Sequence, residues 1–443
     1  MSNAQLQSAE TSASNSASES DSNANAIMGL AQLMSRVFAG EDLALEAQQL
    51  LQRAGEGDAI ALMDLSVLLQ LRGDEATGVA LQQEALSIQQ HFQLIPKVPQ
   101  SPLKVLALMA PGNLMTNTPL EFLAEGAGFQ LDFLYISPDL PRPLYLPEHD
   151  VAFVALSELE RNRESLDLIN PMIADWPRPI LNKPDALLCM GRDQISYRLQ
   201  DMCGLDVPIN AIVSRDQLAY LCIHPGELKQ VLSDAEFPLI VRPLDSHAGN
   251  DLACVEDAAA LLEYLQSTAG ELFYLARFVD YRSTDGQFRK YRIMLINGEP
   301  HLAHMAISDH WMVHYLNAGM MESEVKRKEE ADTMASFSQG FAEKHRAALR
   351  KIYEVSGLDY LGIDCGESPN GDLLVFEVGA SMNVHAMDPV DIFPYKQPQM
   401  QRLFTAFESM MLGEHLNFRI ARRRAAAPFS EPPRGEPGQA VGG

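Results

Sequence analysis

The clearest alternation of apolar and polar positions runs from Leu361 to Asn383 and predicts a β-hairpin. Two apolar runs flank an Asn-Gly pair at 370–371, which is the strongest two-residue signal for a hairpin turn. With that turn, Asp364 lies directly opposite Glu377. One face then carries these carboxylates with Gly362, Gly366, Val375 and Gly379, and the other face carries Leu361, Ile363, Cys365, Leu374, Phe376 and Val378. We therefore expect one face of the hairpin to pack on a hydrophobic core. The other face, which has few bulky side chains, should carry the carboxylate pair.

The carboxylate pair predicts a cation site. Directly opposed like charges destabilise a sheet by roughly 0.2–1 kcal/mol, and a divalent cation between them reverses that effect. Carboxylates combined with phosphate oxygens are how proteins usually hold Mg2+. The alternative is an ordinary solvated hairpin edge, in which Asp364 and Glu377 hold no ligand.

The rest of the pattern predicts a mixed α/β protein. Residues 27–92 have helical periodicity, and residues 104–181 alternate between strands and helices, as in a small parallel sheet covered on both faces. Strands are expected there at 104–109, 129–136, 151–156 and 179–181, and helices at 118–125 and 161–169. Further strands are expected at 237–241, 271–280 and 290–296, and an amphipathic helix at 336–355 leads into the hairpin.

Both ends of the chain are low in complexity. Residues 1–26 are rich in Ser, Asn, Ala and Glu, and residues 413–443 contain an Arg triplet followed by Pro, Gly and Ala, so we expect disorder at both ends. Between them we expect a helical domain at 27–95, an α/β domain at 96–190 and a larger domain at 191–412.

Part of the helical domain, at 64–86, resembles a tetratricopeptide or Sel1-like helix pair. Only one or two such units fit, whereas a stable solenoid needs about three. The domain is therefore either a helical cap on the rest of the chain or a docking module for a protein or peptide partner.

Composition and charge narrow the class of protein. The 443 residues are 47% hydrophobic and 21% charged, which is typical of a soluble globular protein. The net charge of −25 argues against nucleic-acid and anionic-membrane partners, because phosphate groups attract basic surfaces. Five cysteines without metal-binding spacing predict reduced thiols and a cytoplasmic location. We expect no membrane span and no signal peptide.

The segment Pro111–Pro119 follows the first expected strand of the α/β domain. Backbone amides at the start of the next helix can hold an anion such as a substrate carboxylate, with Asn113, Thr116 and Thr118 as the candidate side chains. The alternative is plain capping of that helix by Thr118.

Three segments together resemble the ATP-grasp superfamily, and most closely its glutathione-synthetase-like carboxylate–amine ligases. They are FPLIVRPLDSHAGNDL at 237–252, KYRIMLINGEP at 290–300 and the hairpin itself. Their order is that of the family: a basic strand, a Gly-containing loop, a hinge, an Arg-bearing strand and an acidic hairpin. The resemblance covers roughly residues 179–411. It implies the two-subdomain ATP-grasp fold behind a small parallel sheet, with ATP and Mg2+ as cofactors.

The resemblance also implies roles for individual residues. Nucleotide binding is implied for Arg192 (with Gln194 as its alternative), Arg242, Ser246, His247, Gly249, the hinge residue Phe278 and, at the ribose, Asp280. A role with the acyl phosphate or the substrate carboxylate is implied for Lys290, Arg292 and His304, and Mg2+ ligation for Asp364, Glu377 and Asn383. The chain departs from the family at Gly379, where relatives usually have Asn, and at Arg242, where they usually have Lys.

Four histidines in the segment 301–314 invite a zinc interpretation, but their spacing lacks the usual carboxylate and cysteine partners. We expect this segment to line the acceptor pocket instead.

The expected function is that of an ATP- and Mg2+-dependent ligase, which joins a carboxylate to an amine through an acyl phosphate. The expected acceptor is an amino acid or a peptide. The alternative is a catalytically impaired ATP-grasp protein that serves as a nucleotide- or peptide-binding scaffold, which Gly379, Arg242 and the single glycine of the 246–250 loop favour. A homodimer and a protein partner at the N-terminal helices are compatible with either.

Overall fold

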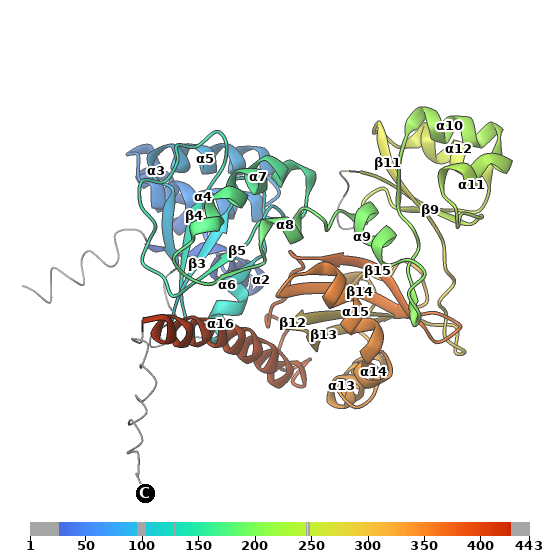
Figure 1. Ribbon diagram of the computed structural model, residues 1–443. Helices are drawn as coiled ribbons and strands as arrows, with labels where there is room; N and C mark the ends of the chain where they lie inside the picture. The colour runs from blue at the N-terminus through green and yellow to red at the C-terminus, as the bar shows by residue number, and fades with distance from the viewer. Residues whose placement is uncertain (1–25, 95–102, 128, 245, 247–248, 427–443) are drawn as a thin grey trace, which may run out of the picture.

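The computed structural model describes residues 26–94, 103–127, 129–244, 246 and 249–426, which form three β-sheets (Figure 1). The six-stranded sheet lies on one side of the molecule, and the five-stranded and four-stranded sheets lie on the other. This mixed α/β architecture confirms the fold class expected from the sequence.

The six-stranded sheet is the core of the first unit. Its strands are β1 (Ala26–Ile27), β2 (His91–Leu94), β3 (Lys104–Met109), β4 (Gln130–Tyr135), β5 (Val151–Val154) and β6 (Ile180–Leu181), in the order β1-β2-β4-β3-β5-β6. Its helices are α2 (Gly29–Phe38), α3 (Ala44–Gly55), α4 (Ala59–Leu71), α5 (Glu75–Ile88), α6 (Leu120–Ala127), α7 (Arg163–Met172) and α8 (Pro184–Leu187). The sheet is mixed rather than parallel, because β2 runs antiparallel to β4.

The N-terminal helices share the core of this unit. Helix α4 is buried along nearly its whole length, and it packs in one hydrophobic cluster with Phe92 of β2 and Phe133 of β4. A helix that is apolar on every side must be enclosed by other elements. The domain boundary expected at residue 95 therefore does not separate two cores. The tetratricopeptide resemblance stays a prediction.

The four-stranded sheet forms the second unit. Its strands are β8 (Ala211–Ser214), β9 (Leu239–Pro243), β10 (Ala253–Val255) and β11 (Leu272–Arg277), in the antiparallel order β10-β9-β11-β8. Helices α10 (Arg215–Ile223), α11 (Leu228–Val231) and α12 (Ala258–Ser267) cover one face, and their apolar side chains enclose a core of their own with the strands.

The five-stranded sheet forms the third unit. Its strands are β7 (Leu205–Asp206), β12 (Phe288–Ile296), β13 (Glu299–Ser308), β14 (Tyr360–Glu367) and β15 (Leu373–Gly379), in the order β13-β12-β14-β15-β7. Its helices are α9 (Arg192–Leu199), α13 (Glu324–Ser336), α14 (Phe341–Lys344) and α15 (Arg346–Ser356). The amphipathic helix expected at 336–355 is thus split between α14 and α15.

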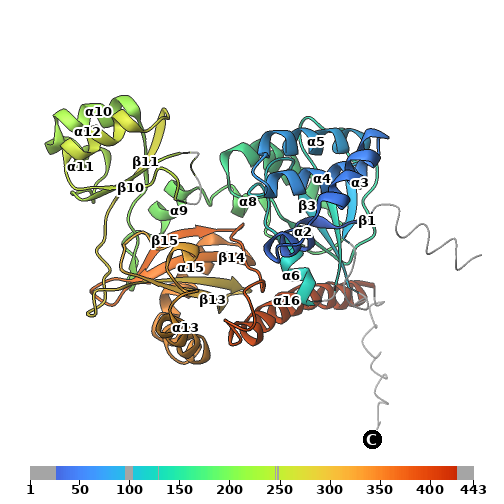
Figure 2. The same cartoon turned by 180° about the vertical axis from the view of Figure 1, so that it is seen from behind.

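The long helix α16 (Lys396–Ala426) joins the first and third units (Figures 1 and 2). Phe407 and Met411 pack into the core of the first unit beside Tyr360 of β14. The disorder expected from residue 413 is wrong for residues 413–426, because good helix formers continue the helix almost to Pro428. Residues 1–25 and 427–443 lie outside the described residues. None of the described helices is long and apolar enough to span a bilayer.

The hairpin β14–β15 confirms the expected pairing of Asp364 with Glu377. The register shifts by one residue between Asp364 and Cys365, and Phe376 is the extra residue of this bulge. Because of this shift, residues between the bulge and the turn lie on the opposite face of the hairpin from the one that strict alternation predicts. Contrary to expectation, Val375 packs with Ile363 and Cys365, and Leu374 packs on the opposite side with Phe376.

Candidate active site

Four polar side chains form one row across the five-stranded sheet. His304 on β13 pairs with Arg292 on β12, Arg292 pairs with Asp364 on β14, and Asp364 pairs with Glu377 on β15. Register shifts occur directly after Arg292 and directly after Asp364, and such bulges are common beside active sites. The sheet thus brings together four residues that were predicted from the sequence to belong to the site: His304, Arg292, Asp364 and Glu377.

Asp364 is held by two cations. Its carboxylate is 4% exposed; it accepts from Lys290 Nζ at 2.9 Å and from Arg292 Nε and Nη2 at 2.8 and 3.0 Å. Burial raises the pKa of Asp364, but the charges of Arg292 and Lys290 outweigh burial and hold this pKa well below its usual range. The like-charge repulsion expected between the two hairpin carboxylates is therefore wrong, because Asp364 already has its own cations.

Glu377 has a separate cation. Arg192, the first residue of α9, donates to Glu377 Oε1 at 2.6 Å and to the Phe376 carbonyl at 3.0 Å. Arg192 thus lies beside the hairpin, whereas Gln194 is exposed. The two hairpin carboxylates are thus bound by cations from two different elements.

The second unit contributes Arg242. This residue lies on β9 opposite Tyr274 of β11, and the Arg192 guanidinium lies 5.9 Å from the Tyr274 ring centre. Burial lowers the pKa of Arg242, the charge of Arg192 lowers it further, and Glu377 raises it. The second and third units thus bring Arg242 and Arg192 together around Tyr274.

Asn383 contacts the row through its backbone and carries a buried side-chain oxygen. Its Oδ1 atom is buried and has no hydrogen-bond partner among the described residues, while its backbone carbonyl accepts from Arg292 Nη1 at 3.2 Å. An unpaired buried carbonyl is costly unless a ligand completes it. No group of three or more His, Cys, Asp and Glu residues that could hold a metal occurs in the described part of the chain. Asp364, Glu377 and Asn383 nevertheless fit Mg2+, which commonly takes one or two carboxylates and completes its shell with water and phosphate.

His304 is a neutral member of the row. Burial lowers its pKa well below the usual value, and the charges of Arg292 and Lys396 lower it further. Its ring lies 4.7 Å from that of Tyr315. His304 can therefore offer a hydrogen bond without adding a third positive charge beside Lys290 and Arg292.

The other residues predicted to bind the nucleotide have different surroundings and do not form one cluster with the row. Ser246 accepts at Oγ from Arg242 Nε at 3.1 Å, and Gly249 is close to Met312. The Phe278 ring packs edge-on against Trp311 at 5.7 Å. Asp280 forms an exposed ion pair with Arg282. The remaining predicted residue, His247, lies outside the described residues.

The anion-binding loop expected at 111–119 is occupied by the protein itself. The Gly112 and Leu114 amides donate to side chains of α5 and α4, namely Gln82 Oε1 at 2.6 Å and Gln70 Oε1 at 3.0 Å. Asn113 and Thr116 hydrogen-bond to each other at 3.3 Å. Thr118 donates its hydroxyl to the Ala380 carbonyl at 3.0 Å. The N-terminal helices thus provide acceptors for two amides of this segment, and anion binding at the start of α6 stays a prediction.

Sequence reasoning missed Glu158, which follows β5. Its Oε2 atom accepts from the Ala380 amide at 3.1 Å, just beyond β15. Burial raises the pKa of Glu158 to about 7. No local motif marks this residue, because more than two hundred positions separate it from the hairpin.

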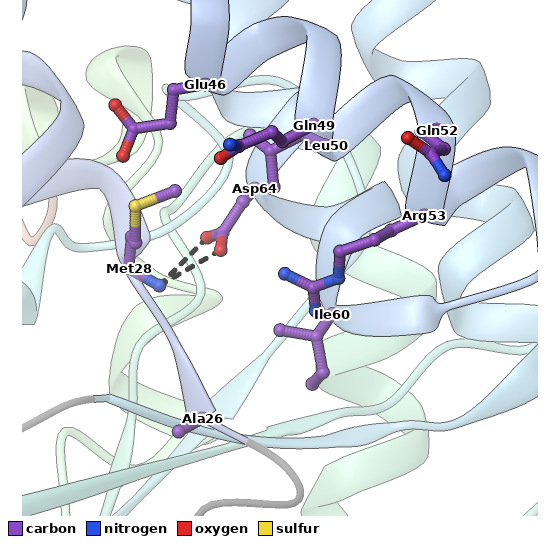
Figure 3. Close-up of a pocket in the computed structure, with 9 residues that line it drawn as sticks. All are labelled: Ala26, Met28, Glu46, Gln49, Leu50, Gln52, Arg53, Ile60 and Asp64. Carbon is purple, nitrogen blue, oxygen red and sulfur yellow. Dashed lines mark hydrogen bonds between the residues drawn. The ribbon is translucent and has the colours of Figure 1, made fainter.

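A cavity of about 420 Å³ lies between the N-terminal helices, away from the residues of the row (Figure 3). Asp64 in its wall accepts from the Met28 amide at 3.0 and 3.1 Å. Because that carboxylate already caps the start of α2, we assign the cavity no chemistry.

Comparison with known proteins yields structural neighbours only. No known protein family matches the sequence, and no curated protein matches it. Among solved structures, the chain is similar to a RimK domain ATP-grasp protein from Sphaerobacter thermophilus (13% identity, 70% of this chain and 100% of that chain, TM-score 0.40). It is also similar to VanG D-Ala:D-Ser ligase from Enterococcus faecalis (12%, 71% and 100%, 0.40) and to the ATP-grasp ligase PsnB complexed with a precursor variant, Mg and ADP (14%, 71% and 99%, 0.39). Likeness at this level carries no argument about the reaction of this chain.

Proposed function

We propose that this chain is an ATP- and Mg2+-dependent ligase that joins a carboxylate to an amine. The observation that carries the proposal is the row of His304, Arg292, Asp364 and Glu377 across four adjacent strands, with Arg242 of the neighbouring unit acting on its Glu377 end. Phosphoryl transfer requires positioned cations and charge neutralisation more than covalent help from the protein. This row, flanked by arginines, supplies both.

The two ends of the row have different tasks. Arg192 and Arg242 bind phosphate oxygens of the nucleotide, because Arg192 is ion-paired with Glu377 and Arg242 lies on β9 opposite Tyr274, on whose ring the Arg192 guanidinium lies. Asp364, Glu377 and Asn383 hold Mg2+, which supplies the charge that neutralises the phosphates when it is bound.

Lys290 and Arg292 serve the substrate carboxylate. The carboxylate oxygen attacks the terminal phosphorus of ATP, ADP leaves, and an acyl phosphate forms. The amine nitrogen then attacks the acyl carbon, phosphate leaves, and the amine releases a proton. Lys290 and Arg292 can stabilise the negative charge of both transition states, since they lie side by side on Asp364. We propose an amino acid or a peptide as the amine.

One observation favours the second candidate, a nucleotide- or peptide-binding scaffold. Lys290 and Arg292 already occupy three acceptor positions of Asp364. If this arrangement persists with nucleotide bound, Asp364 has little capacity left for a cation.

The two candidates differ in turnover. Purified protein is incubated with Mg2+, ATP and pools of amino acids and peptides, and ADP release is measured. The ligase releases ADP only when a carboxylate and an amine are both present, and the Arg242→Ala variant releases much less. Binding of Mg2+–ATP by calorimetry without ADP release from any pool identifies the scaffold.

A further inference from the structure

One side of helix α16 is apolar and exposed. Leu412, Leu416 and Ile420 are 44%, 47% and 49% exposed, and they are four residues apart, so they lie in one row along the helix. The other side, with Phe407 and Met411, is buried in the core of the first unit. Helix α16 runs along the outside of the molecule, and no helix or strand of the described chain lies below it in either view (Figures 1 and 2).

Small residues continue this exposed face. Thr405 and Ser409 are exposed and precede Leu412 at the same helical spacing. Beside Leu412 lies Gly413, where a Cβ atom would meet no atom of the described residues within 4 Å. Glycine is unfavourable inside a helix relative to alanine, whereas a position without a side chain lets the backbone of a second helix come close. The face thus has the shape and the composition of a helix-packing surface.

The charges beside the apolar row indicate which helix fits. Glu408 lies before the row, and the exposed Arg419 lies near its end. When two copies of α16 cross antiparallel near position 414, Leu412 lies opposite the partner's Leu416. Glu408 then lies within one residue of the position opposite the partner's Arg419, so opposite charges meet. A parallel pairing would instead place like charges together.

We propose that this chain forms a two-fold symmetric dimer through the exposed face of α16, with the two helices antiparallel and crossing near residue 414. A two-fold axis requires a self-complementary surface. This face meets that requirement, because its apolar row lies between an acidic and a basic end. An anionic partner, such as a lipid surface, would suit Arg419 but would repel Glu408. The inference does not depend on the proposed function.

Sedimentation of the full-length protein tests the dimer. The measurement is made at about 0.15 M salt, where charges more than about 8 Å apart are screened, because each copy has a net charge of −25. The wild type should be a dimer at about 100 µM. Leu416→Glu should weaken dimerisation at least about tenfold, since it places two charges in the apolar row. Leu45→Glu is the matched control, because Leu45 is 69% exposed on α3, and this variant should associate as the wild type does.

An exchange of charges tests the antiparallel crossing without touching the apolar row. Glu408→Arg and Arg419→Glu should each weaken dimerisation about tenfold, because like charges then meet at both contacts of the dimer. An equimolar mixture of the two variants should dimerise within about threefold of the wild type. In that mixed dimer, an arginine of one copy meets a glutamate of the other at both contacts.

Each contrary outcome overturns the proposal. A wild type that remains monomeric at about 100 µM shows that the face does not bind a second copy. A monomer that binds vesicles containing phosphatidylserine identifies a lipid surface as the partner instead. A dimer that is unaffected by Leu416→Glu has its interface elsewhere. A mixture of the charge variants that associates no better than either variant alone excludes the antiparallel crossing.

Discussion

Replacing Asp364 with asparagine is expected to destabilise the protein even without nucleotide. The carboxylate is 4% exposed and accepts three hydrogen bonds from Lys290 and Arg292. Removing one partner of a buried ion pair costs roughly 3–5 kcal/mol, because it leaves an uncompensated charge. The side chains of Lys290 and Arg292 keep 16% and 22% of their exposure, and asparagine retains one acceptor. We therefore expect a loss at the lower end of that range or just below, about 2–3 kcal/mol.

The pH dependence of this loss has a definite sign. The pKa of Asp364 is held below its ordinary value in the folded protein, so its stabilising contribution is complete above the unfolded pKa of about 3.9. It is lost as the pH falls from there toward the folded pKa. The difference between wild type and Asp364→Asn should be constant around pH 7 and should shrink below about pH 4.

Urea unfolding at pH 7.5, followed by circular dichroism without nucleotide or metal, measures the effect. Asp332→Asn is the control, because Asp332 pairs with Lys328 on an exposed helix face and its loss should leave the midpoint unchanged. An Asp364→Asn protein as stable as the wild type, or more stable, would refute the reasoning. It would mean that repulsion from Glu377 outweighs the attraction of Lys290 and Arg292.

Three further predictions address other parts of the molecule. Arg242→Ala should weaken ATP binding by roughly 1.5–3 kcal/mol, the scale of a charge-assisted bond, and unchanged affinity in calorimetry would remove Arg242 from the site. A chain that begins at residue 103 should fail to fold, since it loses β2 and the buried helix α4; a cooperative unfolding transition for this chain would contradict that view. Because burial lowers the pKa of His304, the unfolded state binds a proton first, so stability should fall below about pH 6.5. A His304→Gln variant with the same slope of urea midpoint against pH between 5 and 7 would show that His304 does not cause it.

The hairpin shows how much of a strand pairing can be predicted from the alternation of apolar and polar residues. The turn signal and the alternation predicted that Asp364 faces Glu377, and the structure confirms this pairing. The bulge at Phe376 could not be predicted, because strict alternation and a shifted register give equally apolar patterns near the turn. What decides between them is the packing of Leu374 and Val375 against different cores, which depends on distant segments.

The composition of the N-terminal helix α4 shows that it is buried, which the spacing of apolar residues alone does not show. The sequence of α4, AIALMDLSVLLQL, is apolar except at Asp64, Ser66 and Gln70, and a helix without a continuous polar face belongs inside a core. Reading composition around the whole helix would have joined this segment to the sheet. The same packing explains why the Gly112 and Leu114 amides are bonded within the protein, since Gln82 and Gln70 reach them from α5 and α4.

In the candidate site, both carboxylates of the hairpin are paired with cations of the protein. Asp364 is neutralised by Lys290 and Arg292, and Glu377 by Arg192. A buried charge left alone is costly, so ATP cannot recruit these cations unless something else neutralises the carboxylates. On the proposed function, Mg2+ would neutralise Asp364 and Glu377, and Arg192, Lys290 and Arg292 would then be available to phosphate and substrate oxygens. Cation and nucleotide should consequently bind together, each weakly without the other, because each replaces the partner that the other removes.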